Sequence, residues 1–176
     1  MKKNLIAIAI VASAALSMSN AIAGGNGQVN FTGAITDNAC TITNTVTSPL
    51  DVNLGVYASS ELNGGAGKET TKQGFKIALT GCPASVPQAS VNFDGTNDTN
   101  NPVLLKLTQD AGVATGVAIQ LYDDAGTALA LHTKSKSYPL VTGDNTLAFN
   151  AAYKSTLGTV TAGPANAVAN FSIIYN

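Results

Sequence analysis

The stretch AVANFSIIYN, residues Ala167–Asn176, closes the chain and decides the fold. Its odd-numbered positions are all apolar, and its even-numbered positions are polar apart from Val168 and Ile174. An alternation with period two predicts a half-buried β-strand. Terminal residues fray unless something holds them, so the aromatic Tyr175 predicts that this strand is paired and buried. The residues expected on the buried face are Ala167, Ala169, Phe171, Ile173 and Tyr175.

Similar short stretches recur upstream of this strand. Residues 58–71 are expected to be loop, and Asp123–Gly126 is expected to be a turn. Turn signals about every ten residues favour an all-β sandwich. No amphipathic helix is evident, although residues 125–131 leave room for one helical turn. The strands are expected at residues 28–35, 74–80, 116–122 and 147–153, with shorter candidates at 50–56, 90–93, 103–107 and 127–131.

The first 23 residues have the features of a secretory signal peptide. Lys2 and Lys3 form the positive start, Leu5–Leu16 forms the apolar segment, and Ala21-Ile22-Ala23 has the small-x-small pattern of a cleavage site. An apolar segment this short and this early indicates secretion rather than a membrane span. We therefore expect an exported chain that begins at Gly24.

The charge pattern excludes one class of partner. The sequence has no arginine, and Lys2 and Lys3 belong to the leader, so seven lysines face ten acidic residues and the mature net charge is near −3. Without a basic patch, nucleic-acid binding is not expected.

The two cysteines, Cys40 and Cys82, predict one structural disulfide, because an even pair in a secreted chain is typical of such a bond. A metal site is the competing interpretation. Two thiols and the single, distant His132 make a poor set of ligands, so we expect no metal and no cofactor.

The residues that could carry catalysis are few. Nucleophile-elbow, zinc-protease and phosphate-binding motifs are all missing, and His132 lies in a polar segment typical of a surface loop. Asp123 and Asp124 are adjacent and fit a turn better than an acid–base pair. The loop Asp94–Asn101 has the spacing of calcium ligands but lacks the glycine and glutamate that such loops require. We therefore expect a protein that is not an enzyme.

The first expected strand follows a glycine-rich leader and has two possible roles. Val29, Phe31 and Ile35 share one face, with Gly33 between them. The strand is either the ordinary first strand of a sandwich or a detachable strand that inserts into another molecule. In the second case Gly33 would fit where the acceptor is narrow, because glycine permits the closest backbone approach.

Three segments, taken in this order behind a signal peptide, resemble a shaft subunit of the chaperone–usher fimbriae, close to the type 1 pilins. They are VNFTGAI (Val29–Ile35), the pair Cys40 and Cys82, and VTAGPANAVANFSIIYN (Val160–Asn176) with its penultimate tyrosine. The strand Gly116–Asp123 followed by Gly126 is similar to a middle segment of these subunits.

This resemblance implies an incomplete immunoglobulin-like β-sandwich that lacks its last strand. It implies a signal peptide at 1–23, a donor-strand extension at 24–36 and a pilin domain at 37–176. An apolar groove would lie beside the C-terminal strand, and a donor strand from another subunit would complete the sandwich. The implied groove and chaperone-edge residues are Phe171, Ile173 and Tyr175, and the implied donor residues are Val29, Phe31, Gly33 and Ile35.

The resemblance also implies a function. The chain would be a structural subunit of a surface fimbria that supports cell adhesion and polymerises by donor-strand exchange. Its partners would be identical or related subunits, a periplasmic chaperone and an outer-membrane usher, on a route through the periplasm to the cell surface. Two alternatives stay open: a minor adaptor pilin, and a secreted carbohydrate-binding β-sandwich module, which the absence of tryptophan disfavours.

Overall fold

The computed structural model describes residues 28–33 and 39–176. The chain divides after Ile35 into two units, and each is described by itself. The predicted signal peptide and the predicted donor residue Ile35 lie outside the described residues. Residues 28–33 contain no strand, so the strand expected there is not formed within them.

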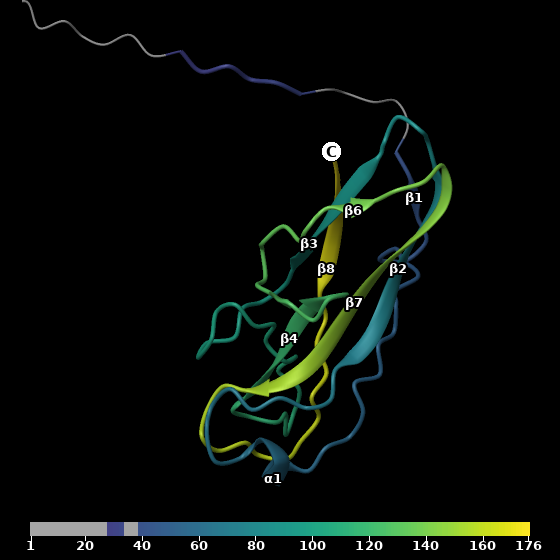
Figure 1. Cartoon of the computed structure of the whole chain (residues 1–176). Helices are drawn as coiled ribbons and strands as arrows, with labels where there is room; N and C mark the ends of the chain where they lie inside the picture. Colours follow the sequence, from purple (N-terminus) through teal and green to yellow (C-terminus); the bar gives the residue numbers. More distant parts are fainter. Residues whose placement is uncertain (1–27, 34–38) are drawn as a thin grey trace, which may run out of the picture. The chain divides into compact units, whose positions relative to one another are not determined.

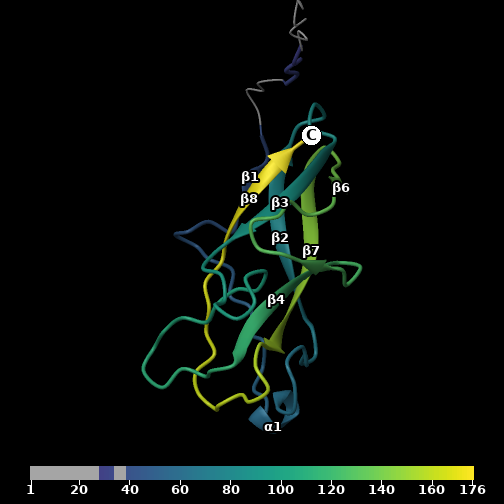
Figure 2. The same ribbon diagram turned by 90° about the vertical axis from the view of Figure 1, so that its left-hand side faces the viewer.

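The described part of the second unit is a sandwich of two antiparallel sheets, which confirms the all-β prediction. In Figure 1, β7 lies between β2 and β4, and in Figure 2 β8 lies alongside β3. The five-stranded sheet has the order β1 (Thr41–Ile42), β2 (Gln73–Cys82), β7 (Gly143–Ser155), β4 (Val117–Asp123) and β5 (Ala128–Leu129). The three-stranded sheet has the order β6 (Tyr138–Pro139), β3 (Gln88–Asp94) and β8 (Asn170–Tyr175).

The long strand β7 organises the larger sheet. Its first half pairs with β2, where Phe149 lies opposite Phe75, and its second half pairs with β4, where Tyr153 lies opposite Ile119. Apolar residues alternate along β2 and β7 and bury one face, as the sequence pattern predicts. Strand β4 is buried along its whole length.

Aromatic side chains from both sheets form the centre of the core. Phe149 of β7 packs edge to face against Phe93 of β3, with ring centroids 5.0 Å apart, and it also contacts Phe75 and Tyr138. Phe93 in turn contacts Phe171 of β8, with ring centroids 6.4 Å apart. The core thus reaches from β6 at one edge of the smaller sheet to β8 at the other.

The short strand expected at residues 50–56 is wrong: the structure has no strand there. Gly55 adopts a positive φ of 87°, which favours glycine and reverses the alternation. Leu54 is buried before it, whereas Val56 is fully exposed after it and Tyr57 turns inward. Within the described residues, this segment therefore has no ladder partner.

Three further differences are local. A single helical turn, α1 (Ser59–Leu62), forms in the expected loop 58–71 rather than near residues 125–131, and the Glu61 carboxylate accepts the Ala58 N–H. The candidate at 103–107 forms only isolated bridges, from Leu105 to Asn97 and to Ile119. The last strand begins at Asn170 rather than Ala167, because the β3 ladder ends at Asp94.

Candidate functional site: an open groove

An apolar groove of about 1390 Å³ lies along one edge of the sandwich. One wall, the first lip, is residues 49–57, and the opposite wall, the second lip, is residues 160–171. Inward side chains of β2, β4 and β7 form its floor: Phe75, Ile77, Val117, Ile119, Leu121 and Ala151.

The second lip and β8 present a free strand edge. Among the described residues, strand β8 pairs only with β3 and is the last strand of its sheet. Even-numbered residues carry the hydrogen bonds to β3, as the bond from Asn176 N–H to Gln88 O shows. In a ladder, neighbouring residues point their N–H and C=O groups to opposite sides. The odd-numbered residues therefore direct theirs toward the groove.

The side chains of the same odd-numbered residues point inward. They are half-buried from Ala165 to Tyr175, and the even-numbered residues between them are exposed. The alternation predicted for the last strand is therefore present, and it begins two residues earlier than expected. Small alanines occupy the groove end at 165, 167 and 169, and large side chains follow from Phe171 onward.

Two tyrosines connect the lips to the floor. Tyr153 of β7 packs edge to face against Tyr57 of the first lip, with ring centroids 6.3 Å apart, and both line the groove. The Tyr153 hydroxyl donates to the Ala165 carbonyl of the second lip at 3.0 Å. Burial, with a smaller contribution from Tyr57, raises the pKa of Tyr153, so this hydroxyl keeps its proton.

The start of the second lip is held by close backbone contacts. The Thr115 N–H donates to the Thr161 hydroxyl oxygen at 2.9 Å. A Cβ on Gly163 would lie 2.1 Å from Gly112 O, and one on Gly116, whose φ is 73°, would lie 2.2 Å from Thr159 O. Only glycine fits at these two positions.

The predicted disulfide between Cys40 and Cys82 is present. It joins the residue before β1 to the last residue of β2. The Tyr175 hydroxyl donates to the Cys40 carbonyl at 3.3 Å, so the end of β8 is tied to the same point. Burial raises the pKa of Tyr175, although the bond to Cys40 opposes this shift.

The predicted groove residues share one face but differ in position. Phe171 lines the groove, whereas Ile173 and Tyr175 pack half-buried against the core beyond it. Among the predicted donor residues, Val29 and Phe31 are 74% and 93% exposed, and a Cβ on Gly33 would have no neighbour within 4 Å.

Sequence reasoning missed the first lip and the two tyrosines Tyr57 and Tyr153 as groove residues. Tyr153 was expected only as part of an ordinary strand. The alternation that ends at Tyr175 extends back to Ala165, and this was the available signal for the full length of the second lip.

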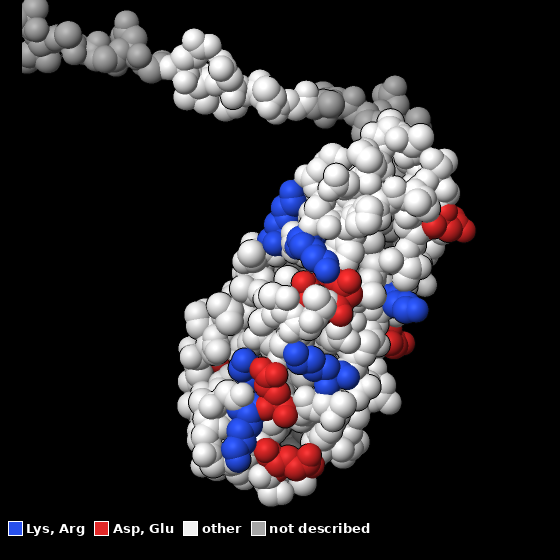
Figure 3. All heavy atoms as spheres, in the orientation of Figure 1, with Lys and Arg blue, Asp and Glu red and all other residues white. Residues whose placement is uncertain are grey.

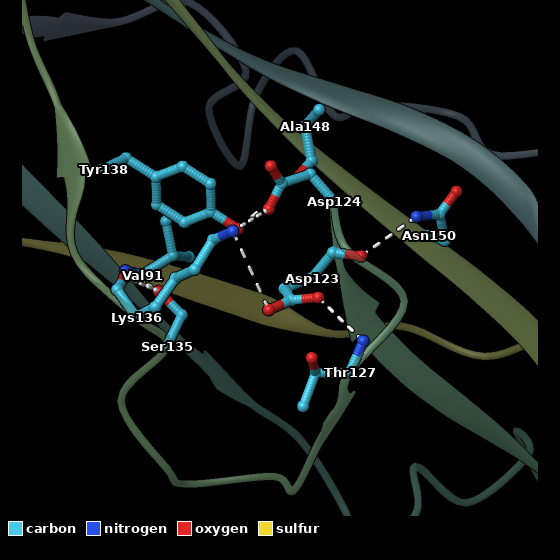
Figure 4. Close-up of polar contacts among 9 residues, drawn as sticks. All are labelled: Val91, Asp123, Asp124, Thr127, Ser135, Lys136, Tyr138, Ala148 and Asn150. Carbon is cyan, nitrogen blue, oxygen red and sulfur yellow. Dashed lines mark hydrogen bonds and ion pairs between the residues drawn. The ribbon is translucent and has the colours of Figure 1, made fainter.

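The polar residues weighed for chemistry have local structural roles. Asp123 and Asp124 form the expected turn, in which the Asp123 carboxylate accepts the Thr127 N–H at 2.7 Å. Figure 4 shows the Lys136 ammonium beside both carboxylates, and the bond to Lys136 lowers the pKa of Asp124. Tyr138, in the same cluster, donates to Ala148 O at 3.4 Å.

The remaining candidates are also accounted for by local contacts. The Asp98 carboxylate accepts the N–H groups of Asn100 and Asn101, as in a turn. His132, with a φ of 60°, is exposed, and its ring bonds Asp94 and Asn97. None of these residues lines the groove.

Lysines and carboxylates are intermingled on the face seen in Figure 3. One example is the ion pair between Lys154 and Glu69, with N···O 2.8 Å. Burial alone would raise the pKa of Glu69, but the bond to Lys154 lowers it. No helix in the described ranges is both long and apolar enough to span a membrane.

The fimbrial protein family matches residues 29–176, from the first predicted donor residue to the last residue of the chain. The chain belongs to this family. A relative, long polar fimbria protein A of Salmonella typhimurium (strain LT2), is 32% identical over 172 residues, which is 97% of this chain and 93% of that protein.

Solved structures share the fold. A Burkholderia pseudomallei antigen and type I fimbria protein is 43% identical with a TM-score of 0.61, covering 85% of this chain and 97% of that one. The subunit in a chaperone–usher pilus structure is 24% identical with a TM-score of 0.63, covering 86% and 96%. This fimbrial protein is therefore a structural, non-enzymatic subunit of cell-surface fimbriae.

Proposed function

We propose that this fimbrial subunit polymerises head to tail, with residues 24–36 of one copy filling the groove of the next. The observation that carries the proposal is the free edge of β8 beside an apolar groove in the core. An open edge over exposed core is a hazard for aggregation unless a strand covers it.

The dimensions support this occupant. The half-buried alternation along the groove edge spans eleven residues, from Ala165 to Tyr175. The extension 24–36 is of similar length, and both segments would rise about 3.3 Å per residue as extended strands. Burial of Val29, Phe31 and Ile35 would contribute on the order of 5–8 kcal/mol, to which a ladder of main-chain bonds adds.

The sizes of the side chains suggest a register. Phe171 is the largest residue of the second lip that lines the groove. Among the four predicted donor residues, Gly33 is the one without a side chain, so we place Gly33 opposite Phe171. Gly33→Leu should then block assembly, and adding Phe171→Ala to the acceptor should restore it by making room.

Such a contact is heterologous, because the extension and the groove are different surfaces of the same molecule. A heterologous contact that does not close into a ring propagates as a filament. The mature chain would therefore assemble without another component once its grooves become available.

The deciding experiment compares Phe31→Asp with the neighbouring Thr32→Asp. Both variants add one negative charge, but only the first places it on the apolar face. We expect electron microscopy and sedimentation to show no filaments for Phe31→Asp and normal filaments for Thr32→Asp. Filaments of ordinary length from Phe31→Asp would refute the proposal.

We propose also that a periplasmic chaperone covers the groove first and that an outer-membrane usher exchanges it for the next subunit. The support is the exposed core along β8, which needs a partner before assembly, together with the fold shared with a chaperone–usher pilus. Deleting Tyr175 and Asn176 should abolish recovery of a soluble complex with the chaperone. If the same amount of soluble complex were recovered, the chaperone would have to bind somewhere other than this edge.

We place this chain in the main rod rather than among the minor adaptors. One curated relative, 35% identical over 152 residues, is a probable major fimbrial subunit. Quantitative mass spectrometry of sheared fimbriae should find this chain as the most abundant protein. A ratio of a few copies per fimbria would favour the adaptor instead.

A further inference from the structure

The three half-buried alanines of the second lip, Ala165, Ala167 and Ala169, have equivalent side chains but different backbone hydrogen bonds. If the backbone alternation of β8 continues through this segment, all three direct N–H and C=O toward the groove. In the described residues, no backbone or side-chain group bonds these polar atoms at Ala167 or Ala169. At Ala165 the carbonyl already accepts the Tyr153 hydroxyl, at 3.0 Å.

The backbone around Ala165 is also held from its other side. The Ala114 N–H donates to Pro164 O at 2.9 Å, and the Thr108 N–H donates to Asn166 O at 2.7 Å. Three consecutive carbonyls of the second lip are therefore occupied. This part of the lip is anchored before any strand arrives, whereas the part from Ala167 onward is open for pairing.

The Tyr153 hydroxyl occupies a position that an incoming strand would need. It lies 3.0 Å from the Ala165 oxygen, which is the distance at which a partner's amide nitrogen would stand in a ladder. A partner's amide would compete with the hydroxyl for the Ala165 oxygen, and displacing the hydroxyl would leave a half-buried polar group without a partner. An unpaired buried polar group is unfavourable, so pairing at Ala165 brings no net gain.

We infer that Tyr153 ends the strand-addition site, so that the incoming strand forms ladder bonds from Tyr175 to Ala167 and none at Ala165. This inference rests on the proposed function and names a residue that sets the register of the reaction. A slide by two residues keeps every side chain on its own face. Three identical alanines do not oppose that slide, whereas the hydroxyl does.

The test uses full-length mature chain carrying Phe31→Asp as the acceptor, so that its own extension does not compete. The donor is a synthetic peptide of residues 24–36, and the measurement is amide hydrogen exchange by NMR. We expect the peptide to slow exchange at Ala167 and Ala169 by roughly 100-fold and to change Ala165 by less than about 3-fold.

Two further variants of the acceptor test the role of the hydroxyl itself. Tyr153→Phe keeps the ring and frees the Ala165 carbonyl. The peptide should then also slow exchange of the Ala165 amide, by roughly 10-fold or more. Tyr57→Phe is the matched control, because the Tyr57 hydroxyl bonds Thr71 O and not the second lip. It should behave like the parent acceptor.

The inference would be overturned if the peptide slowed amide exchange in the parent acceptor as much at Ala165 as at Ala167. This outcome counts even if Tyr153→Phe fails to fold. An unchanged Ala165 in a folded Tyr153→Phe acceptor would also overturn it. A peptide that slows no amide between Ala167 and Tyr175 would instead overturn the proposed function, and this inference with it.

Discussion

Phe93 and Phe149 join the two sheets at their centre, with rings packed edge to face and centroids 5.0 Å apart. Phe149 is 1% exposed, so Phe149→Ala should lower the free energy of unfolding by about 3–5 kcal/mol through lost burial and a cavity. Phe31→Ala is the control, because Phe31 is 93% exposed, and its effect should stay within about 0.5 kcal/mol. Denaturant titration of both monomers measures the difference, and equal losses would contradict this account of the core.

The close contact between Gly116 and Thr159 predicts a second effect. Gly116→Ala introduces a Cβ 2.2 Å from a backbone oxygen at a positive φ, so the second lip must shift. We expect a loss of about 2 kcal/mol or more in unfolding free energy. Gly158→Ala is the matched control, since a Cβ there meets nothing within 4 Å. A Gly116→Ala variant as stable as the control would show that the contact relaxes freely.

The disulfide predicts a third effect. Cys40 and Cys82 are 42 residues apart, and closing a loop of this size stabilises the native state by about 4 kcal/mol in the chain-entropy model. The variant with both cysteines replaced by alanine should unfold at correspondingly lower denaturant concentration. Reduced wild-type protein should match it, and a change below about 1 kcal/mol in either would mean that the unfolded chain is already compact.

The ion pair between Lys136 and Asp124 predicts a dependence on pH. Lys136 lowers the pKa of Asp124 below 3.8, so this stabilisation is present above pH 3.8 and is lost as the pH falls through the lowered value. Asp124 raises the pKa of Lys136 above 10.5, so the stabilisation is also lost as the pH rises through the raised value.

Lys136→Met should therefore differ from wild type in unfolding free energy between about pH 5 and 9 and converge with it at both extremes. Lys106→Met removes the same charge, and Lys106 takes part in none of the ion pairs in the described residues. That control should differ from wild type by an amount that does not follow this pH pattern. If the unfolding free energy of Lys136→Met differed from that of wild type by the same amount at every pH, Lys136 would stabilise the fold by packing instead.

The strands that alternate cleanly were predictable from sequence because burial on one face leaves a period of two. Strands β2, β4 and β7 formed where residues 74–80, 116–122 and 147–153 predicted them, with some lengthening at the ends. The segment 50–56 has the same period but no neighbour to pair with. Pairing depends on which segments meet in space, and local pattern does not contain that information.

The groove was predictable only in part, for the same reason. The apolar face of Phe171, Ile173 and Tyr175 follows from alternation, but their division into one groove residue and two core residues depends on where the second lip leaves β3. Tyr57 could not be assigned from sequence, because the positive φ of Gly55 reverses which residues face inward.

The junction at Cys40 decides how the folded chain responds to a pull on its N-terminal side. The disulfide passes such a load directly to the end of β2, which is held along β7 by a ladder. The residues between Cys40 and Cys82 form a closed loop that tension cannot draw out. At about 3.5 Å per extended residue, the disulfide prevents roughly 150 Å of chain from being extended by the applied force.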